Sequence, residues 1–163
     1  MSDTLAALEV LKELDSALVW MQVEEVSEDS EQPWPNFNLF WILNVTLLRT
    51  IGHVLKNVDR KKDPVLRKII DDKYQEWETD RNRHSVFWEF ICKERNNILK
   101  NYEKGVVYHW DSMNTCWLAN YKDGNEEYDT IGCLYAAYEW WERQLKYIEN
   151  AYQSEISKDS CSS

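Results

Sequence analysis

The stretch ICKERNNILKNYE, which runs from Ile91 to Glu103, carries the residues best suited to chemistry in this sequence. Arg95 and Asn96 stand side by side, and Lys100 and Tyr102 follow shortly after. An arginine can hold a phosphate through two parallel hydrogen bonds, and a lysine adds a point charge. The stretch therefore indicates either a nucleic-acid or nucleotide site or an ordinary polar stripe on a helix.

A regular helix over this stretch places Arg95 and Tyr102 on nearly the same line, because seven residues make almost two full turns. Lys100 lies about 140 degrees around the helix from Arg95. The two bases therefore reach one ligand only through long side chains, a local kink or a second subunit. We predict that Arg95 and Tyr102 form one surface for a phosphate-bearing ligand.

More basic residues flank this stretch. Arg81, Arg83 and Lys93 are binding candidates together with Asn96. Another group could add a phosphate-contacting rim: Arg60, Lys61, Lys62, Arg67 and Lys68. Acidic neighbours dilute that group, so we favour simple solvation of helix ends for it.

Other reaction chemistries have little support in the sequence. The three histidines are scattered, no HExxH or paired Cys-His spacing occurs, and we expect no metal. His53 beside Gly52 is expected to be a core histidine. No P-loop, GxGxxG or GxSxG motif is present, so we expect no cofactor.

The charge is uneven along the chain. The formal net charge is -10, which argues against a general polyanion binder. Residues 1–33 hold nine acidic residues and one basic residue. Residues 122–163 hold nine acidic and four basic residues. Residues 34–121 hold eleven acidic and fourteen basic residues, so the middle of the chain can still carry a basic patch.

Composition favours one helical domain in a reducing compartment. The chain has 163 residues with only 4 Gly and 3 Pro, too few turn signals for a sandwich or barrel. Its 4 cysteines form no CxxC pair, and the N-terminus lacks the pattern of a signal peptide. The longest apolar run, 37–48, is too short to span a membrane. We expect a cytoplasmic protein.

Five segments carry helical periodicity. Apolar residues form a seam over 7–21 and recur from the Asp63-Pro64 start to Trp77. They cover nearly every face of 37–58, so we expect this segment to be the central helix, surrounded by other elements. A fourth helix is predicted over 85–104, with Gly105 as its stop. We interpret 106–127 as a long irregular loop, in which VVYHW could be a short strand and KDGNE a turn.

The last helix shows the clearest pattern. Residues at three-four spacing form a seam: Ile131, Leu134, Tyr138, Trp141, Leu145, Ile148 and Tyr152. This seam could pack on the first helix or form a two-fold dimer interface. Trp140 and Tyr135 lie off the seam and are the better candidates for exposed, base-stacking rings. For both rings we favour a core or dimer contact over stacking. The predicted fold is an all-α, single-domain bundle of about five helices over 1–157, with a frayed tail over 158–163.

The pattern R-x4-K-x-Y, formed by Arg95, Lys100 and Tyr102, resembles the R-x4-6-H motif of the HEPN superfamily. It is most similar to the R-x4-H-x-Y form found in toxin members of that superfamily. The Arg95-Asn96 pair also fits. The resemblance implies an all-α, frequently dimeric protein of toxin or phage-defence type and a metal-independent endoribonuclease. In that role Arg95 stabilises phosphorane charge, Asn96 positions the phosphate, Lys100 contributes charge and Tyr102 orients the substrate.

Lys100 stands where the superfamily has its histidine. A lysine stays charged near pH 7 and is a poor proton shuttle, so we expect RNA or nucleotide binding with weak or absent hydrolysis. The alternative is a non-catalytic acidic interaction protein, such as an antitoxin, an inhibitor or a polyanion mimic, which binds a protein partner through its acidic ends.

Overall fold

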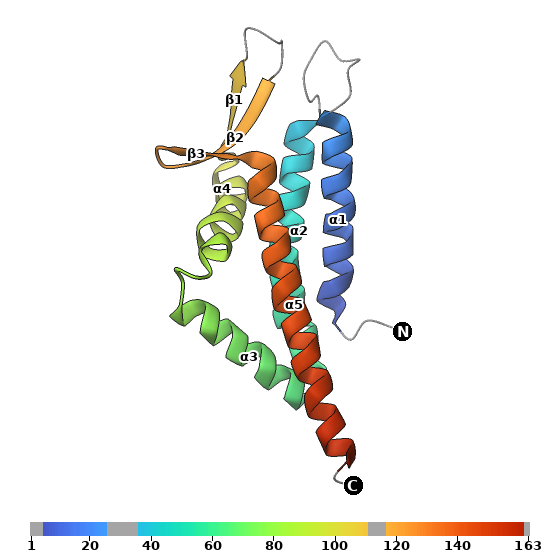
Figure 1. Cartoon of the computed structure of the whole chain (residues 1–163). Coiled ribbons are helices and arrows are strands. Elements are labelled where there is room, and N and C mark those ends of the chain that lie inside the picture. Colours follow the sequence, from blue (N-terminus) through green and yellow to red (C-terminus); the bar gives the residue numbers. More distant parts are fainter. Residues whose placement is uncertain (1–4, 26–35, 111–116, 162–163) are drawn as a thin grey trace.

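The computed structural model describes residues 5–25, 36–110 and 117–161, and it confirms a mostly helical, single-domain bundle (Figure 1). The five α-helices are α1 (Ala6–Glu25), α2 (Phe37–Asn57), α3 (Pro64–Thr79), α4 (Lys93–Asn101) and α5 (Thr130–Cys161). A 3-10 turn, η1 (Asp59–Lys61), and a π-helical segment, η2 (Val86–Cys92), complete the helical part.

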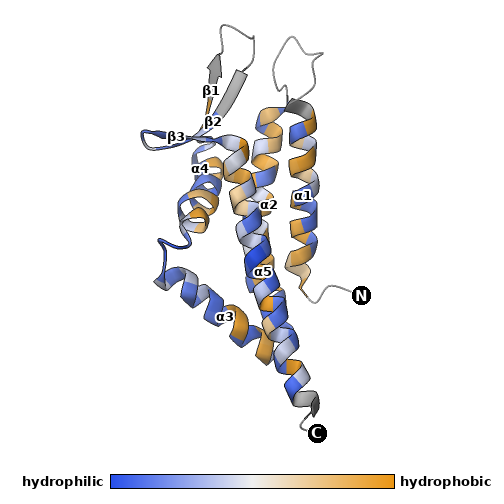
Figure 2. Cartoon of the chain, viewed as in Figure 1, coloured by the Kyte–Doolittle hydropathy of each residue, from blue (hydrophilic) through white to orange (hydrophobic). Residues whose placement is uncertain are grey.

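The helices α1 and α2 pack against each other, and α5 packs against both (Figure 1). The predicted α1 seam is confirmed, because Ala7, Leu11, Leu14, Leu18 and Met21 are all buried. Apolar residues recur along α1 and α2, interspersed with polar ones (Figure 2). The expectation that α2 is surrounded on nearly every face is wrong, since Leu39 is 65% exposed and Leu43 is 40% exposed.

The helical stretch over residues 37–61 is long and apolar enough to cross a bilayer, judged by length and composition. The apolar run 37–48 taken alone is too short for this. Such length and composition are weak support for a membrane span, because core helices of soluble proteins pass the same test. The core-facing side of α2, which includes Trp41, Leu48 and Leu55, is fully buried in the bundle.

The seam of α5 belongs to the core of the same chain. Leu134, Trp141, Leu145 and Ile148 are fully buried, and α5 packs against α1, α2, α3 and η2. The indole Nε1 of Trp141 donates to the Leu48 carbonyl over 2.8 Å. The seam therefore packs within the bundle and is not available as a dimer interface. The helix continues to Cys161, into the segment for which fraying is expected.

The start of α3 follows the sequence signal. The Asp63 carboxylate accepts a hydrogen bond from the Leu66 amide over 2.9 Å, and Pro64 takes the first helical position. Both devices complete a helix N-terminus whose first amides lack helical partners. Leu66, Ile70 and Trp77 then face the core.

The single helix predicted over 85–104 is wrong in two respects. It begins as the π-helical η2, and α4 ends at Asn101 rather than at Gly105. Tyr102 occupies the C-cap with a φ of 54 degrees, in the left-handed region that non-glycine residues seldom adopt. Gly105 is needed for another reason: an added Cβ would lie 2.6 Å from Cε2 of Tyr121.

The described parts of 106–127, residues 106–110 and 117–127, are mostly strands rather than an irregular loop, and residues 111–116 of that predicted loop lie outside the described residues. The strands β1 (Val106–Trp110), β2 (Trp117–Asp123) and β3 (Glu126–Asp129) form an antiparallel sheet in that order. Val106 pairs with Tyr121 and Tyr121 with Tyr128. The VVYHW strand and the KDGNE turn are confirmed, with Gly124 at a φ of 64 degrees. Tyr121 is only 3% exposed and fastens the sheet to the bundle beside Trp41 and Phe90.

A partly buried polar cluster joins α3, the turn before η2 and α5. His84 accepts a hydrogen bond at Nδ1 from the Trp140 indole over 3.2 Å, and its Nε2 lies 3.4 Å from Oε1 of Glu76. Lys73 is also buried and donates to Glu76 over 2.8 Å. The Trp140 bond requires an unprotonated Nδ1, so the folded chain holds His84 neutral.

Stability should fall as the pH is lowered from about 7 to 5. Burial lowers the pKa of His84 below its ordinary value in the folded chain. The unfolded chain therefore binds more protons in this interval, which favours unfolding as acid is added. We expect the Tm to fall between pH 7 and pH 5, and His84→Gln, which can still accept from Trp140, to flatten that dependence.

Melting curves should stay above pH 5 for this comparison. Glu76 has a lowered pKa because Lys73 donates a hydrogen bond to it, so its contribution is lost only at lower pH. Equal pH slopes for the wild type and His84→Gln would show that another group dominates the transition.

Candidate functional site

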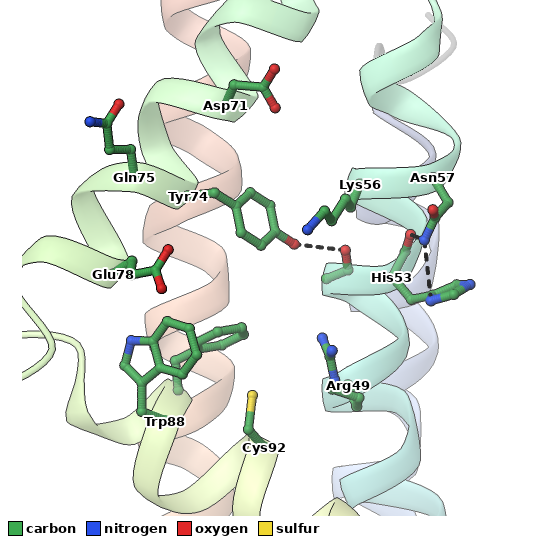
Figure 3. A pocket seen from close by; sticks show the side chains of 12 residues that line it. Arg49, His53, Lys56, Asn57, Asp71, Tyr74, Gln75, Glu78, Trp88 and Cys92 are labelled. Atoms are coloured by element: carbon green, nitrogen blue, oxygen red, sulfur yellow. Dashed lines mark hydrogen bonds between the residues drawn. The ribbon is translucent and has the colours of Figure 1, made fainter.

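A cavity of about 520 Å³ opens between α2, α3 and η2 (Figure 3). The helix α2 supplies one wall through Arg49, Gly52, His53, Lys56 and Asn57. These positions recur at three-four spacing and therefore share one face of the helix. This wall is basic, and Figure 3 shows Arg49 and Lys56 pointing from it toward α3.

Arg49 is the most unusual residue of this wall. It is half-buried, and within the described residues its guanidinium makes no hydrogen bond or ion pair. Gly52 lets it lie close to the core, because an added Cβ would stand 3.1 Å from Trp141 and 3.3 Å from Nη1 of Arg49. A half-buried guanidinium is poorly solvated, so an anion in the cavity would stabilise it.

His53 and Asn57 are linked on the same wall. The Asn57 amide nitrogen donates to the His53 carbonyl over 2.9 Å and lies 3.2 Å from Nδ1 of His53. This arrangement assigns the acceptor role to Nδ1 and leaves Nε2–H as a donor. His53 is exposed, so its prediction as a core histidine is wrong.

The opposite wall comes from α3, through Asp71, Tyr74, Gln75 and Glu78. Tyr74 donates to the Gly52 carbonyl over 2.8 Å, and burial raises the pKa of its hydroxyl. Two hydrogen bonds from Arg60, at 2.5 and 2.8 Å, satisfy the Asp71 carboxylate and lower its pKa. Among the described residues, Glu78 has only a long contact to Arg81, at 3.5 Å, and its side chain is exposed.

The third wall is the π-helical segment, which contributes Phe87, Trp88 and Cys92. π-helical turns are rare and occur frequently at functional sites. The Trp88 indole donates to the Trp77 carbonyl over 2.9 Å, and this bond fixes its ring at the cavity. Burial raises the pKa of the Cys92 thiol, although nearby Arg49 and Arg95 oppose that shift. Cys92 is therefore a protonated lining residue rather than a nucleophile.

The residues of the predicted motif do not converge. Arg95 is half-buried on α4, where Nη1 donates to Oδ1 of Asn96 over 2.9 Å. Lys100 is exposed near the end of α4. Tyr102 is 74% exposed at the C-cap, where Lys104 lies 4.8 Å from its ring centre. The common line predicted for Arg95 and Tyr102 is wrong, because the helix ends before Tyr102.

Two predicted site residues lie near residues of the cavity without lining it themselves. Arg95 lies close enough to Cys92 to affect its pKa. The guanidinium of Arg81 lies 4.3 Å from the ring centre of Trp88. Lys93 instead forms an ion pair with Asp123 of the sheet, and Arg83 is exposed beside Asp80.

Other expectations are settled by burial and ion pairs. Trp140 is only 4% exposed and packs in the core, as the favoured alternative for these rings expects, and Tyr135 is half-buried. In the second basic group, Arg60, Lys62 and Lys68 form ion pairs with Asp71, Asp59 and Asp72. This supports the solvated interpretation of that group.

The sequence did carry a signal for the missed residues. Arg49, His53 and Lys56 are polar positions at helical spacing within an otherwise apolar helix. A polar stripe of this kind marks either solvent or a cavity wall. No comparable sequence pattern marks Tyr74 or Trp88 as cavity residues, because the elements that carry them lie next to α2 only in the folded chain.

No protein-family model matches this chain, and no curated protein or solved structure is significantly similar to it. Its function is therefore inferred from the geometry and chemistry of the cavity.

Proposed function

We infer that the protein binds a phosphate-bearing ligand, a nucleotide or the end of a short RNA, in the cavity between α2, α3 and η2, without hydrolysing it at pH 7. The observation that carries this proposal is the half-buried Arg49 guanidinium, which has no protein partner among the described residues. An arginine fork matches two oxygens of a phosphate.

The surroundings of Arg49 suit such a ligand. Lys56 adds a second cation on the same wall, and His53 offers an Nε2–H donor. Tyr74, Phe87 and Trp88 supply aromatic surface for an apolar ring. The cavity volume of about 520 Å³ lies in the range of small-molecule sites.

A local site fits the charge of the chain better than a broad nucleic-acid surface. The formal net charge is -10, and many exposed bases are engaged in ion pairs, as Lys12, Arg81, Arg143 and Lys158 are. The acidic excess of the chain opposes general attraction to a polyanion.

The predicted motif lacks a side chain that could transfer a proton during RNA cleavage. Lys100 is exposed and does not lie on the same helix line as Arg95, and Tyr102 lies beyond the helix. A metal-free ribonuclease needs a group that exchanges protons at the scissile phosphate. Arg95 beside the cavity is compatible with a HEPN-like binding protein. Membership of that superfamily, a toxin or phage-defence role and a homodimer stay predictions.

The decisive variant is Arg49→Gln, which keeps a polar side chain and removes the charge. We expect wild type to bind AMP measurably by isothermal titration calorimetry and Arg49→Gln to bind at least about tenfold more weakly, a loss of about 1.4 kcal/mol. Arg49→Lys should be intermediate, because lysine keeps the charge without the fork.

Arg143→Gln is the matched control, since Arg143 is an exposed arginine on α5 that pairs with Glu139. It should bind AMP as wild type does. Equal affinity of the Arg49→Gln variant and wild type, or no heat of binding at millimolar AMP, would overturn the proposal. The interaction-protein alternative would then gain support, because α1 exposes Val19, Trp20 and Val23 by 50%, 61% and 54%.

A further inference from the structure

The two long walls of the cavity differ in charge. The α2 wall carries Arg49 and Lys56, whereas the α3 wall carries Asp71 and Glu78. Figure 3 shows Arg49 and Glu78 on opposite sides of the cavity, with Trp88 on the same side as Glu78. A ligand that fits both walls must therefore offer an anion at one end and hydrogen-bond donors at the other.

The two carboxylates of α3 are not equally available. Asp71 already accepts two short hydrogen bonds from Arg60, at 2.5 and 2.8 Å. Glu78 has a single contact of 3.5 Å to Arg81, at the limit of a hydrogen bond, and both side chains are largely exposed. Glu78 is therefore the acceptor that a ligand can engage at little cost.

Arg81 is also held by another interaction. Its guanidinium stacks 4.3 Å from the ring centre of Trp88, a cation–π contact that persists without Glu78. Releasing Glu78 to a ligand thus leaves Arg81 with a favourable partner. Trp88 and Glu78 together offer an aromatic surface next to a carboxylate acceptor at this end of the cavity.

We propose that the cavity selects nucleotides whose base carries an exocyclic amino group, with the phosphate on Arg49 and the amino group donating to the Glu78 carboxylate beside Trp88. This inference rests on the proposed function and adds the identity of the base. An amino-bearing base such as adenine donates to a carboxylate, whereas a carbonyl at the same position repels it. Gln75, which also lies on the α3 wall, can form a hydrogen bond with an amino group or with a carbonyl, so it does not discriminate between the two kinds of base.

The matched probes are AMP and IMP. IMP has a carbonyl in place of the amino group and a hydrogen on the neighbouring ring nitrogen, so its donor is displaced by one ring position and a carboxylate placed for the amino group meets the carbonyl instead. In calorimetric titrations at pH 7 we expect wild type to prefer AMP by about fivefold, the effect of one net hydrogen bond at a partly solvated site. Glu78→Gln should bring the AMP/IMP ratio close to one, because its amide both donates and accepts. Glu139→Gln, an exposed carboxylate on α5, should keep the wild-type ratio.

The outcomes separate this inference from the proposed function. Equal binding of AMP and IMP that still depends on Arg49 would overturn the selection of amino-bearing bases and leave phosphate binding in place. A preference for AMP that survives in Glu78→Gln would overturn the role of Glu78. Absence of binding for both nucleotides would overturn both proposals together.

Discussion

Asp59→Ala is expected to lower the free energy of unfolding by about 2–4 kcal/mol. The Asp59 carboxylate is fully buried and joins two distant parts of the chain. It accepts from the amides of Ala6 and Ala7 over 2.7 and 3.0 Å, and Lys62 lies 2.7 Å from Oδ1. Alanine would leave these amides at the start of α1 without an acceptor.

The position of Asp59 adds to this effect. The first amides of a helix have no partner within it and carry partial positive charge, so a carboxylate there both accepts hydrogen bonds and offsets the helix dipole. Lys62 is partly exposed and can return to water when Asp59 is removed, but the Ala7 amide is buried and cannot. The unsatisfied amide therefore dominates the cost.

Urea denaturation measures this prediction. Asp59→Asn should be intermediate, because one amide oxygen replaces two carboxylate oxygens. Asp72→Ala is the control, since Asp72 is an exposed acid that pairs with the exposed Lys68 at 3.2 Å, and it should change stability by less than about 0.5 kcal/mol. A similar loss for Asp59→Ala and Asp72→Ala would contradict the anchoring role of Asp59.

The elements that the sequence predicts well are those set by local spacing. The α1 seam, the Asp63-Pro64 start of α3 and the α5 seam each depend on residues within a few turns of one helix. Burial follows from such periodicity because one apolar face must leave water. The same spacing does not predict which helix each seam packs against. From the sequence alone, the α5 seam could therefore pack within its own chain or against a second copy.

What the sequence does not predict depends on contacts between distant residues. Asp59 reaches α1 across more than fifty residues. Tyr121 belongs to a region without helical periodicity, yet its ring packs in the aromatic core beside Trp41. The cavity is missed for the same reason: Arg49 and Trp88 belong to elements that meet only in the folded chain.

The motif shows the limit of spacing arguments. Arg95 and Tyr102 share a line only on a continuous helix. The chain leaves the helix at Tyr102, whose left-handed backbone turns it toward the sheet. Nothing in the residue types of this stretch marks Tyr102 as the C-cap, a position that more often holds glycine or asparagine.

Glu94→Ala should lower the free energy of unfolding by about 2–4 kcal/mol, whereas Glu94→Gln should change it by less than about 1 kcal/mol. Glu94 is fully buried on α4, next to Arg95 in the sequence. Its Oε1 accepts from the Trp41 indole and the Gly105 amide, both over 2.8 Å. Alanine would leave both buried donors without an acceptor.

Glutamine keeps an acceptor at the position of Oε1 and removes a buried charge. The second carboxylate oxygen, Oε2, has no hydrogen-bond partner among the described residues, so the charge is only partly compensated. The new NH2 group would occupy the place of Oε2 without an acceptor, a cost that offsets much of the gain. These opposing effects explain the small change expected for Glu94→Gln.

Urea denaturation of both variants, combined with AMP titration, separates the structural role of Glu94 from ligand binding at the cavity. Glu94 fastens α4 to α2 through Trp41 and to the start of the sheet through Gly105. Glu94→Gln preserves both contacts, so Arg95 should stay beside the cavity and AMP affinity should match wild type. A large loss of stability in Glu94→Gln would mean that the charge itself holds these elements together, and the two-donor account of Glu94 would fail.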